Sequence, residues 1–268
     1  GPNDKCPLTP ESALLSFIDK IDTLIGFIAI NLKPTGSKDP FGIRRSVLGI
    51  IRIILENKIR VSMRDVYIKS YRSYLNQNTK LVHNELETIN ISSDFLMERL
   101  KGYIREIGVS QSCILSVCNM TKSDDIFDIV QKIYALDNFV KTKKGKIFIQ
   151  NLKRVRRILS IEEKKERCVF EGKIIKSLLK EKEEKELYNY YIQINKKTHE
   201  LLKSEMYEKA MLTFLKIENK LEKFFDNVQI NVDNKNIRIN RLNILSSIRK
   251  TFIDFADFSL IEIENEVK

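Results

Sequence analysis

The chain has 268 residues, of which 43% are hydrophobic and 31% charged, so it can bury a sizeable core and is not a disordered tail. Its 47 Lys and Arg against 36 Asp and Glu give a net charge of +11, which favours partners with phosphate backbones. A general enrichment in lysine explains the same charge without any ligand. The longest apolar run, residues 24–30, is too short to span a bilayer, and we expect a cytoplasmic protein.

Few glycines and prolines, no tryptophan and abundant Lys, Glu, Ile and Leu predict an all-α fold. A first helix is expected over 12–30, where Asp19 and Asp22 interrupt an apolar stripe. Asp39 followed by Pro40 predicts the start of a helix over 40–56. Three interpretations of Arg44 and Arg45 in this helix stay open, namely phosphate contact, interdomain ion pairing and contact with a partner subunit.

Short helices are expected over 66–75, 81–89, 94–107 and 110–117, with Asp94 and Ser110 as candidate caps. Two more are expected over 124–140 and 146–159. The last of these carries a basic face with apolar residues at helical spacing on its other side. The cations of this helix, together with those just before it in the sequence, are Lys141, Lys143, Lys144, Lys146, Lys153, Arg154, Arg156 and Arg157. This face suits a phosphate backbone, and a solvated face without a ligand is the alternative.

Dense Lys and Glu residues over 161–186 predict an exposed helix, and we place a domain boundary near Ser160, dividing the chain into 1–160 and 161–268. Helical periodicity follows over 187–202 and 207–228, and a last helix starts near Arg238.

At about 100° per residue, the last helix places its arginines within or beside the apolar arc. Arg241 is therefore expected to dock two helices, either by pairing with a carboxylate such as Asp226 or by bonding helix-end carbonyls. Arg238 is open to either a structural role or RNA contact. The expected polar side carries Asn240, Asn243, Ser247 and Lys250, and the preceding loop offers Asn234, Lys235 and Asn236.

The four cysteines, Cys6, Cys113, Cys118 and Cys168, have no metal-site spacing, and we expect buried or half-buried thiols. No Gly-rich phosphate loop and no nucleophile with a matching base is recognisable, which indicates a non-catalytic chain. No metal site is expected.

Two sequence blocks carry a family resemblance. The first, over 220–261, has the order F-F-D-x-V, a short acidic loop, R-x-N-R-L and D-x-S, and the second is KIDTLIGFIAINLKPTGSKDPFGIRRSVLGIIRIILE over 20–56. Both resemble the β subunit of bacterial-type glycyl-tRNA synthetases, the first block its C-terminal, DALR-like anticodon-binding domain. An element of the form KRV-x-x-I-L, from Lys153 to Leu159, also matches, although Arg157 stands where the family would have Asn.

The resemblance implies the C-terminal portion of that subunit: a helical domain containing the end of an HD-like region plus linking helices, followed by a helical anticodon-binding bundle. The implied partners are tRNA(Gly) and the synthetase α subunit, in a heterotetramer. ATP and Mg²⁺ are expected on the α subunit and no cofactor on this chain. Asp22 would match the last metal-binding aspartate of HD phosphohydrolases, whose other ligands are absent here; it is otherwise an ion-pair or capping residue.

The expected function is therefore to bind tRNA(Gly) and position it for glycylation on the other subunit. The alternatives are an HD-type metal-dependent phosphohydrolase fragment and a non-enzymatic helical adaptor. The residues expected to contact tRNA are Lys153, Arg154, Arg156, Arg157, Arg238, Asn240, Asn243 and Lys250, with Asp226 and Arg241 as structural residues of the motif.

Overall fold

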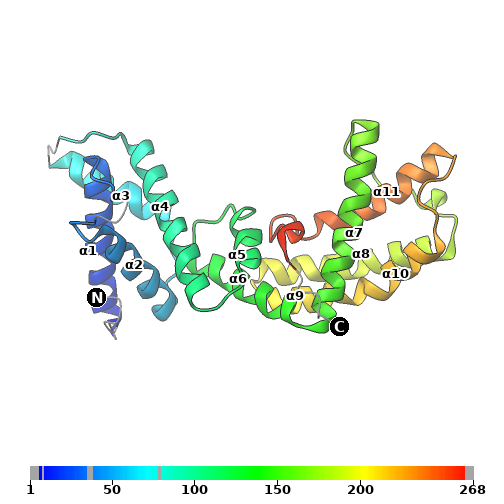
Figure 1. Cartoon of the computed structure of the whole chain (residues 1–268), viewed down its shortest axis with the longest axis horizontal. Coiled ribbons are helices and arrows are strands. Elements are labelled where there is room, and N and C mark those ends of the chain that lie inside the picture. Colours follow the sequence, from blue (N-terminus) through cyan, green and yellow to red (C-terminus); the bar gives the residue numbers. More distant parts are fainter. Residues whose placement is uncertain (1–5, 8, 35–38, 78–79, 263–268) are drawn as a thin grey trace. The chain divides into compact units, whose positions relative to one another are not determined.

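The computed structural model describes residues 6–7, 9–34, 39–77 and 80–262, and every regular element in these ranges is a helix. The prediction of an all-α fold is confirmed. The chain divides into two compact units, one formed by residues 1–114 and 122–131 and the other by residues 115–121 and 132–268 (Figure 1).

The first unit is built around α1 (Pro10–Ala29), which packs against α2 (Ile43–Asn57), α3 (Met63–Asn76) and α4 (Glu85–Glu106). Thr9 caps α1 by accepting a hydrogen bond from the Ser12 amide, and Pro10 occupies the first helical position. The buried stripe of α1 has the predicted helical spacing and supplies the centre of this core. Two further helices, α5 (Gln111–Cys118) and α6 (Ile126–Lys141), each have residues in both units.

Two predictions about helix boundaries in this unit are wrong. The helices expected over 81–89 and 94–107 are the single helix α4, which starts with a capping box between Asn84 and Glu87. Asp94 lies inside this helix and caps nothing. The N-cap of α2 is Gly42, with φ of 66°, rather than Asp39. Asp39 still serves the start of α2, because its carboxylate accepts hydrogen bonds from the amides of Ile43 and Arg44 at 2.8 and 3.1 Å.

Asp22 joins two helices of the first unit. Its carboxylate accepts hydrogen bonds from Ser70 Oγ at 2.9 Å and from Tyr74 Oη at 3.0 Å, and both partners lie in α3. Burial and this bond to Asp22 raise the pKa of Tyr74 to about 12, so the phenol stays a donor. The structure thus gives Asp22 a packing role between α1 and α3.

The second unit contains α7 (Lys143–Glu166), α8 (Lys182–Lys203), α9 (Tyr207–Phe214), α10 (Glu218–Asn227) and α11 (Lys235–Lys250), with short 3₁₀ helices over Lys176–Leu178, Leu215–Ile217 and Phe258–Leu260. α11 packs against both α7 and α8, and α10 also contacts these two helices. Phe214 is central to the core, since its ring lies 5.9 Å from that of Phe148 and 5.0 Å from that of Phe252.

The exposed helix expected over 161–186 is not formed. α7 continues to Glu166, where Arg167 adopts a left-handed conformation with φ of 53°, and the chain then runs without helix to residue 175. A short 3₁₀ turn precedes α8. Ser160 lies within α7 and in the second unit, and the division of the chain at this residue stays a prediction.

All four cysteines are free thiols. Cys113 is buried and Cys6 and Cys118 are half-buried, as predicted, whereas Cys168 is exposed because it follows the end of α7. Across the described ranges, no helix is both long and apolar enough to cross a membrane.

Candidate nucleic-acid interface

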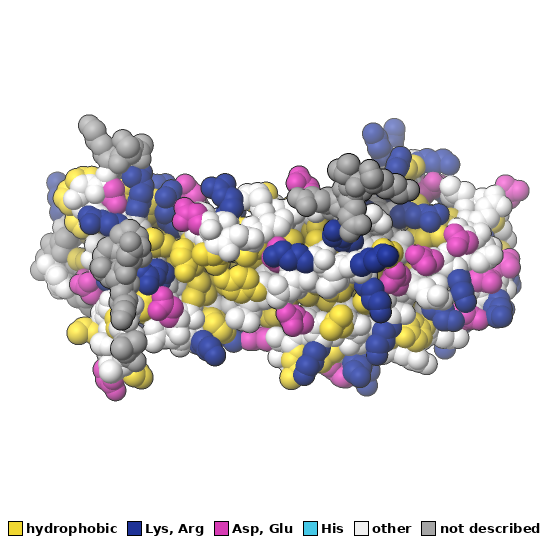
Figure 2. Space-filling model, turned by 60° about the horizontal axis from the view of Figure 1, so that its bottom comes forward, with side chains coloured by type: hydrophobic (Ala, Val, Ile, Leu, Met, Phe, Trp, Pro, Cys, Tyr) yellow, Lys and Arg dark blue, Asp and Glu magenta, His cyan; other side chains and the backbone are white. Residues whose placement is uncertain are grey.

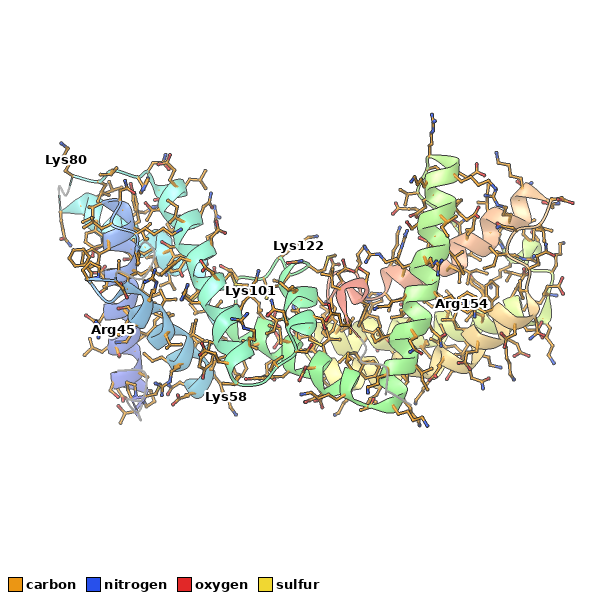
Figure 3. The ribbon with its side chains drawn as sticks, in the orientation of Figure 1. Arg45, Lys58, Lys80, Lys101, Lys122 and Arg154 are labelled. Carbon is orange, nitrogen blue, oxygen red and sulfur yellow. The ribbon has the colours of Figure 1, made fainter. Side chains whose placement is uncertain are left out.

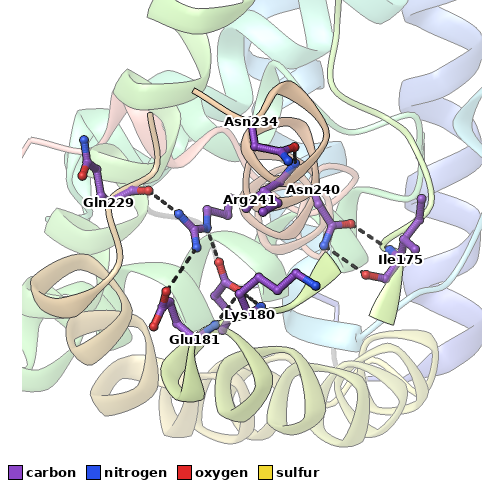
Figure 4. A network of polar contacts seen from close by, with 9 residues as sticks. Ile175, Lys180, Glu181, Gln229, Asn234, Asn240 and Arg241 are labelled. Carbon is purple, nitrogen blue, oxygen red and sulfur yellow. Dashed lines mark hydrogen bonds and ion pairs between the residues drawn. The ribbon is translucent and has the colours of Figure 1, made fainter. Parts of the chain in front are cut away.

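Arg241 is a buried structural residue of the second unit (Figure 4). Its Nε donates a hydrogen bond to Glu184 of α8, and its Nη1 donates to the carbonyl of Gln229, just after α10, at 2.5 Å. The side chains of Arg241 and Glu184 are 5% and 0% exposed. The predicted docking role agrees with this geometry, but the carboxylate partner is Glu184 and not Asp226, which is exposed.

Two other arginines of α11 are held by acids of α7. Arg238 donates to Glu162 and, at 2.7 Å, to Glu166, while Arg249 forms a two-pronged pair with Glu163 at 2.7 and 3.0 Å. Hydrogen bonding to these guanidinium groups lowers the pKa of each of the three carboxyl groups. These arginines therefore tie α11 to α7.

The expected exposure of Asn240 and Asn243 is wrong, because they are only 2% and 5% exposed. Asn240 accepts a hydrogen bond from the amide of Ile175 at 2.7 Å and donates to the carbonyl of the same residue at 3.1 Å (Figure 4). Asn243 accepts from the Gly172 amide at 3.2 Å. Both side chains satisfy the backbone of the non-helical segment between α7 and α8, which covers the face of α11 expected to meet solvent.

Other polar residues around the start of α11 lie closer to solvent. Asn234 caps the helix by accepting hydrogen bonds from the amides of Asn236 and Ile237. Lys235 and Asn236 are exposed. Lys250, at the other end of the helix, forms an ion pair of 2.8 Å with Glu171.

The middle of α7 presents several cations toward solvent. Arg154 and Arg157 are exposed and Lys153 is half-buried, and within the described residues none of the three forms an ion pair. Arg156 differs from them because it pairs with Asp257, whose carboxylate also binds Ser259. We name Lys153, Arg154 and Arg157 the α7 cation cluster. Basic residues continue toward the start of the helix at Lys143, Lys144 and Lys146.

Arg154 lies over an aromatic ring. Its guanidinium carbon is 4.2 Å from the centroid of Phe225 in α10, and Figure 3 shows where this side chain lies on α7. At this distance the arginine and the half-buried ring attract each other as a cation–π pair. The guanidinium is thereby held without an acid that would neutralise it.

A hollow of about 290 Å³ adjoins the α7 cation cluster. Lys153 and Arg156 lie at its cationic edge, and Ile253, Ala256 and Phe258 provide apolar surface. Figure 2 shows a wider face on which Lys and Arg side chains alternate with Asp and Glu. Charge on this face is therefore mixed, and local groups of cations matter more than the net charge.

Sequence reasoning missed two sets of partners. Glu162 continues the apolar stripe of Val155 and Leu159 at helical spacing, which is a signal that this carboxylate points inward and needs a cation. The adjacent Phe224 and Phe225 are separated by about 100° around α10, so both cannot face the same core. Phe224 is buried and Phe225 is the ring beneath Arg154.

Two parts of the chain match known protein families. Residues 152–264, which contain the α7 cation cluster and α11, match the model of the DALR anticodon binding domain. Residues 1–119 match the model of the glycyl-tRNA synthetase beta subunit.

The similar proteins agree with both matches. The glycine–tRNA ligase beta subunits of Ruegeria sp. (strain TM1040) and Paracoccus denitrificans (strain Pd 1222) are 35% and 33% identical to the chain over 98% of it. That of Buchnera aphidicola subsp. Acyrthosiphon pisum (strain 5A) is 37% identical over 96%. Along nearly all of its length, the chain is therefore similar to glycyl-tRNA synthetase β subunits. It spans about 36% of the length of each of these relatives.

Proposed function

We propose that this chain binds tRNA through the α7 cation cluster and so serves as the tRNA-binding, C-terminal part of a glycine–tRNA ligase β subunit. The observation that carries the proposal is a set of three cations that have no ion-pair partner in the described part of the chain, on a helix that belongs to the segment matching the anticodon-binding model. Lysine and arginine side chains in this state can neutralise phosphates without first breaking a protein ion pair.

The proposed role in the ligase is positioning. The chain would hold tRNA(Gly) so that its acceptor end reaches an active site on a separate α subunit, where ATP and Mg²⁺ would be used, in a cytoplasmic heterotetramer. Holding the substrate in place contributes to rate by removing its freedom to move before the reaction. The relatives' names, glycine–tRNA ligase beta subunit, support this assignment. An HD-type phosphohydrolase is less well supported, since Asp22 is engaged by Ser70 and Tyr74.

The geometry around Arg154 supports an additional contact with an unstacked base. One face of its guanidinium lies on Phe225, and arginine planes stack on bases in single-stranded RNA loops. Arg154→Lys keeps the charge and removes the planar group. We expect this variant to bind tRNA(Gly) several-fold more weakly while keeping the wild-type salt dependence; unchanged affinity would remove the base from the proposal and leave the phosphate contacts in place.

The main test is binding of a tRNA(Gly) transcript by the triple variant Lys153→Ala, Arg154→Ala, Arg157→Ala. Because three phosphate contacts are lost, we expect roughly tenfold weaker binding at moderate salt. Lys196→Ala, Lys197→Ala, Lys209→Ala is the matched control, since it removes the same charge from exposed positions on α8 and α9. Equal affinity of both triple variants, with equal melting temperatures, would contradict the proposal. Arg156 is left unchanged because its loss would also disturb Asp257.

A further inference from the structure

A groove in the first unit has the properties of a second anion site. It lies between the start of α2 and the last turns of α4, has a volume of about 460 Å³, and is lined by residues of the first unit alone. The basic residues on its walls are Arg44 and Arg45 from α2 and Arg99, Lys101 and Arg105 from α4. Figure 3 marks Arg45 and Lys101.

Positive charge is in excess along this groove. Among the described residues that line the groove there are five cations and two carboxylates, those of Glu98 and Glu106, and Glu98 already pairs with Arg99 at 2.9 Å. Among the described residues, Arg45, Lys101 and Arg105 have no ion-pair partner, and both arginines of this group are exposed. A site with this balance attracts an anion.

The backbone of α4 is open to the groove at Gly102. Glycine is among the least favourable residues in a helix, and Gly102 lies in α4 about one turn before its last residue, Glu106. Apart from its chain neighbours and the backbone of its own helix, no described residue has an atom within 4 Å of the position that a Cβ would take there, so packing within the protein does not require glycine. The missing side chain instead leaves room in the groove wall beside Lys101 for close approach of a ligand.

Arg99 lies on the wall of the groove. Its Nε is buried and has no acceptor among the described residues, although its Nη2 bonds Glu98. This atom is shielded from solvent, and the guanidinium lies 5.7 Å from the centroid of the Phe95 ring. Arg99 therefore adds to the positive potential of the groove wall and is not one of the contacting cations.

We infer that this groove binds phosphates of an RNA backbone, with Arg45, Lys101 and Arg105 as the contacting cations. The inference rests on the proposed function in one respect, that the RNA is the tRNA bound by the α7 cation cluster. Planar guanidinium groups fit phosphate oxygens in a two-pronged geometry, and a row of cations along an open groove suits a repeating anion better than one small carboxylate. The first unit would then be an RNA-binding part in its own right.

The test uses the full chain and a tRNA(Gly) transcript. In the triple variant Arg45→Ala, Lys101→Ala, Arg105→Ala, we expect the plot of log affinity against log salt to become shallower by about 2, at roughly 0.7 to 0.9 per lost contact. The control variant Arg64→Ala, Lys69→Ala, Lys80→Ala removes exposed cations of the same unit outside the groove and should leave the slope near wild type.

Gly102→Leu separates shape from charge. Leucine favours the helix and keeps every cation, but its side chain would project into the groove. We expect at least about threefold weaker tRNA binding with an intact melting transition, because the phosphate could no longer approach the backbone.

The outcomes distinguish this inference from the proposed function. Wild-type salt slopes in the groove triple variant, together with weaker binding in the α7 triple variant, would overturn the inference and leave the proposed function standing. Unchanged tRNA binding combined with weaker binding to a purified glycyl-tRNA synthetase α subunit would assign the groove to a protein partner and would likewise overturn it. Wild-type tRNA affinity in the α7 triple variant, together with a shallower salt slope in the groove triple variant, would contradict the proposed function and leave the groove result intact.

Discussion

The arginines of α11 and the cations of α7 lie in the same unit but have opposite surroundings. Arg238, Arg241 and Arg249 are each held by one or more carboxylates, and the first two are largely buried. Lys153 and Arg157 have no acid partner within the described residues, and Arg154 lies on an aromatic ring. The arginine-rich end of the domain therefore stabilises the fold, while the middle of α7 carries the cations that we propose to contact tRNA.

The two regions are coupled through the acids of α7. Glu162, Glu163 and Glu166 stand at the end of the helix and are engaged by Arg238 and Arg249. These carboxylates would otherwise weaken the positive potential along α7, and their neutralisation by α11 preserves it. Under the proposed function, Arg238 and Arg249 would thus support binding indirectly, by pairing with the acids near the α7 cation cluster.

The largest effect is expected from breaking the most buried ion pair. Arg241→Met leaves Glu184, with a fully buried side chain, without its charge partner, and we expect a loss of about 3–5 kcal/mol in unfolding free energy. Denaturant unfolding measures it. Combining the change with Glu184→Met should cost less than the sum of the two single changes, since no charge is left unpaired. A loss below about 1 kcal/mol would show that the pair is not needed to dock α11.

A smaller effect is expected at Asn240. Asn240→Ala removes both hydrogen bonds to the backbone of Ile175, and leaving these groups unpaired should cost about 1–3 kcal/mol. The measurement is again the unfolding free energy, followed by tRNA affinity under conditions where the variant is fully folded. Unchanged stability with weaker tRNA binding would contradict the structural role and restore the sequence-based expectation of RNA contact.

The smallest stability effect concerns acid pH. Because Arg238 lowers the pKa of Glu162 in the folded state, the stabilisation is fully present above the ordinary glutamate pKa of 4.5. This stabilisation is lost as the pH falls through the lowered pKa of Glu162 in the folded state. We expect the denaturation midpoint to drop below about pH 4.5, and to drop less in Arg238→Met, where Glu162 no longer accepts a hydrogen bond from a guanidinium. Parallel pH profiles of the two proteins would rule out this pair as a contributor.

Much of the fold follows from sequence pattern alone. The stripe of α1 and the burial of Leu242, Leu245 and Ile248 arise from spacing and residue type, whereas α11 begins at Lys235, after the Asn234 cap, and not near Arg238 as predicted. The end of α7 after Glu166 could not be predicted in this way, because the dense Lys and Glu residues that follow favour helix locally. The non-helical conformation there is stabilised by tertiary contacts of residues 172–175 with α11.

Prediction of the candidate site was less complete for a related reason. A helical wheel assumes one buried side, whereas α11 is covered by α7, by α8 and by the extended segment before α8, so residues on opposite sides are buried together. Asn240 and Asn243 were misplaced for this reason. The exposed Arg154 and Arg157 were predicted correctly, since α7 has one apolar stripe and an open opposite side.

The salt dependence of tRNA(Gly) binding tests the central claim most directly. Three proteins are compared: wild type, the triple variant Lys153→Ala, Arg154→Ala, Arg157→Ala, and the double variant Arg238→Met, Glu166→Gln. The double variant removes an α11 arginine without altering the net charge. We predict that the slope becomes shallower by about 2 in the α7 variant and stays at the wild-type value in the α11 variant. A wild-type slope in the α7 variant with a shallower slope in the α11 variant would contradict the account.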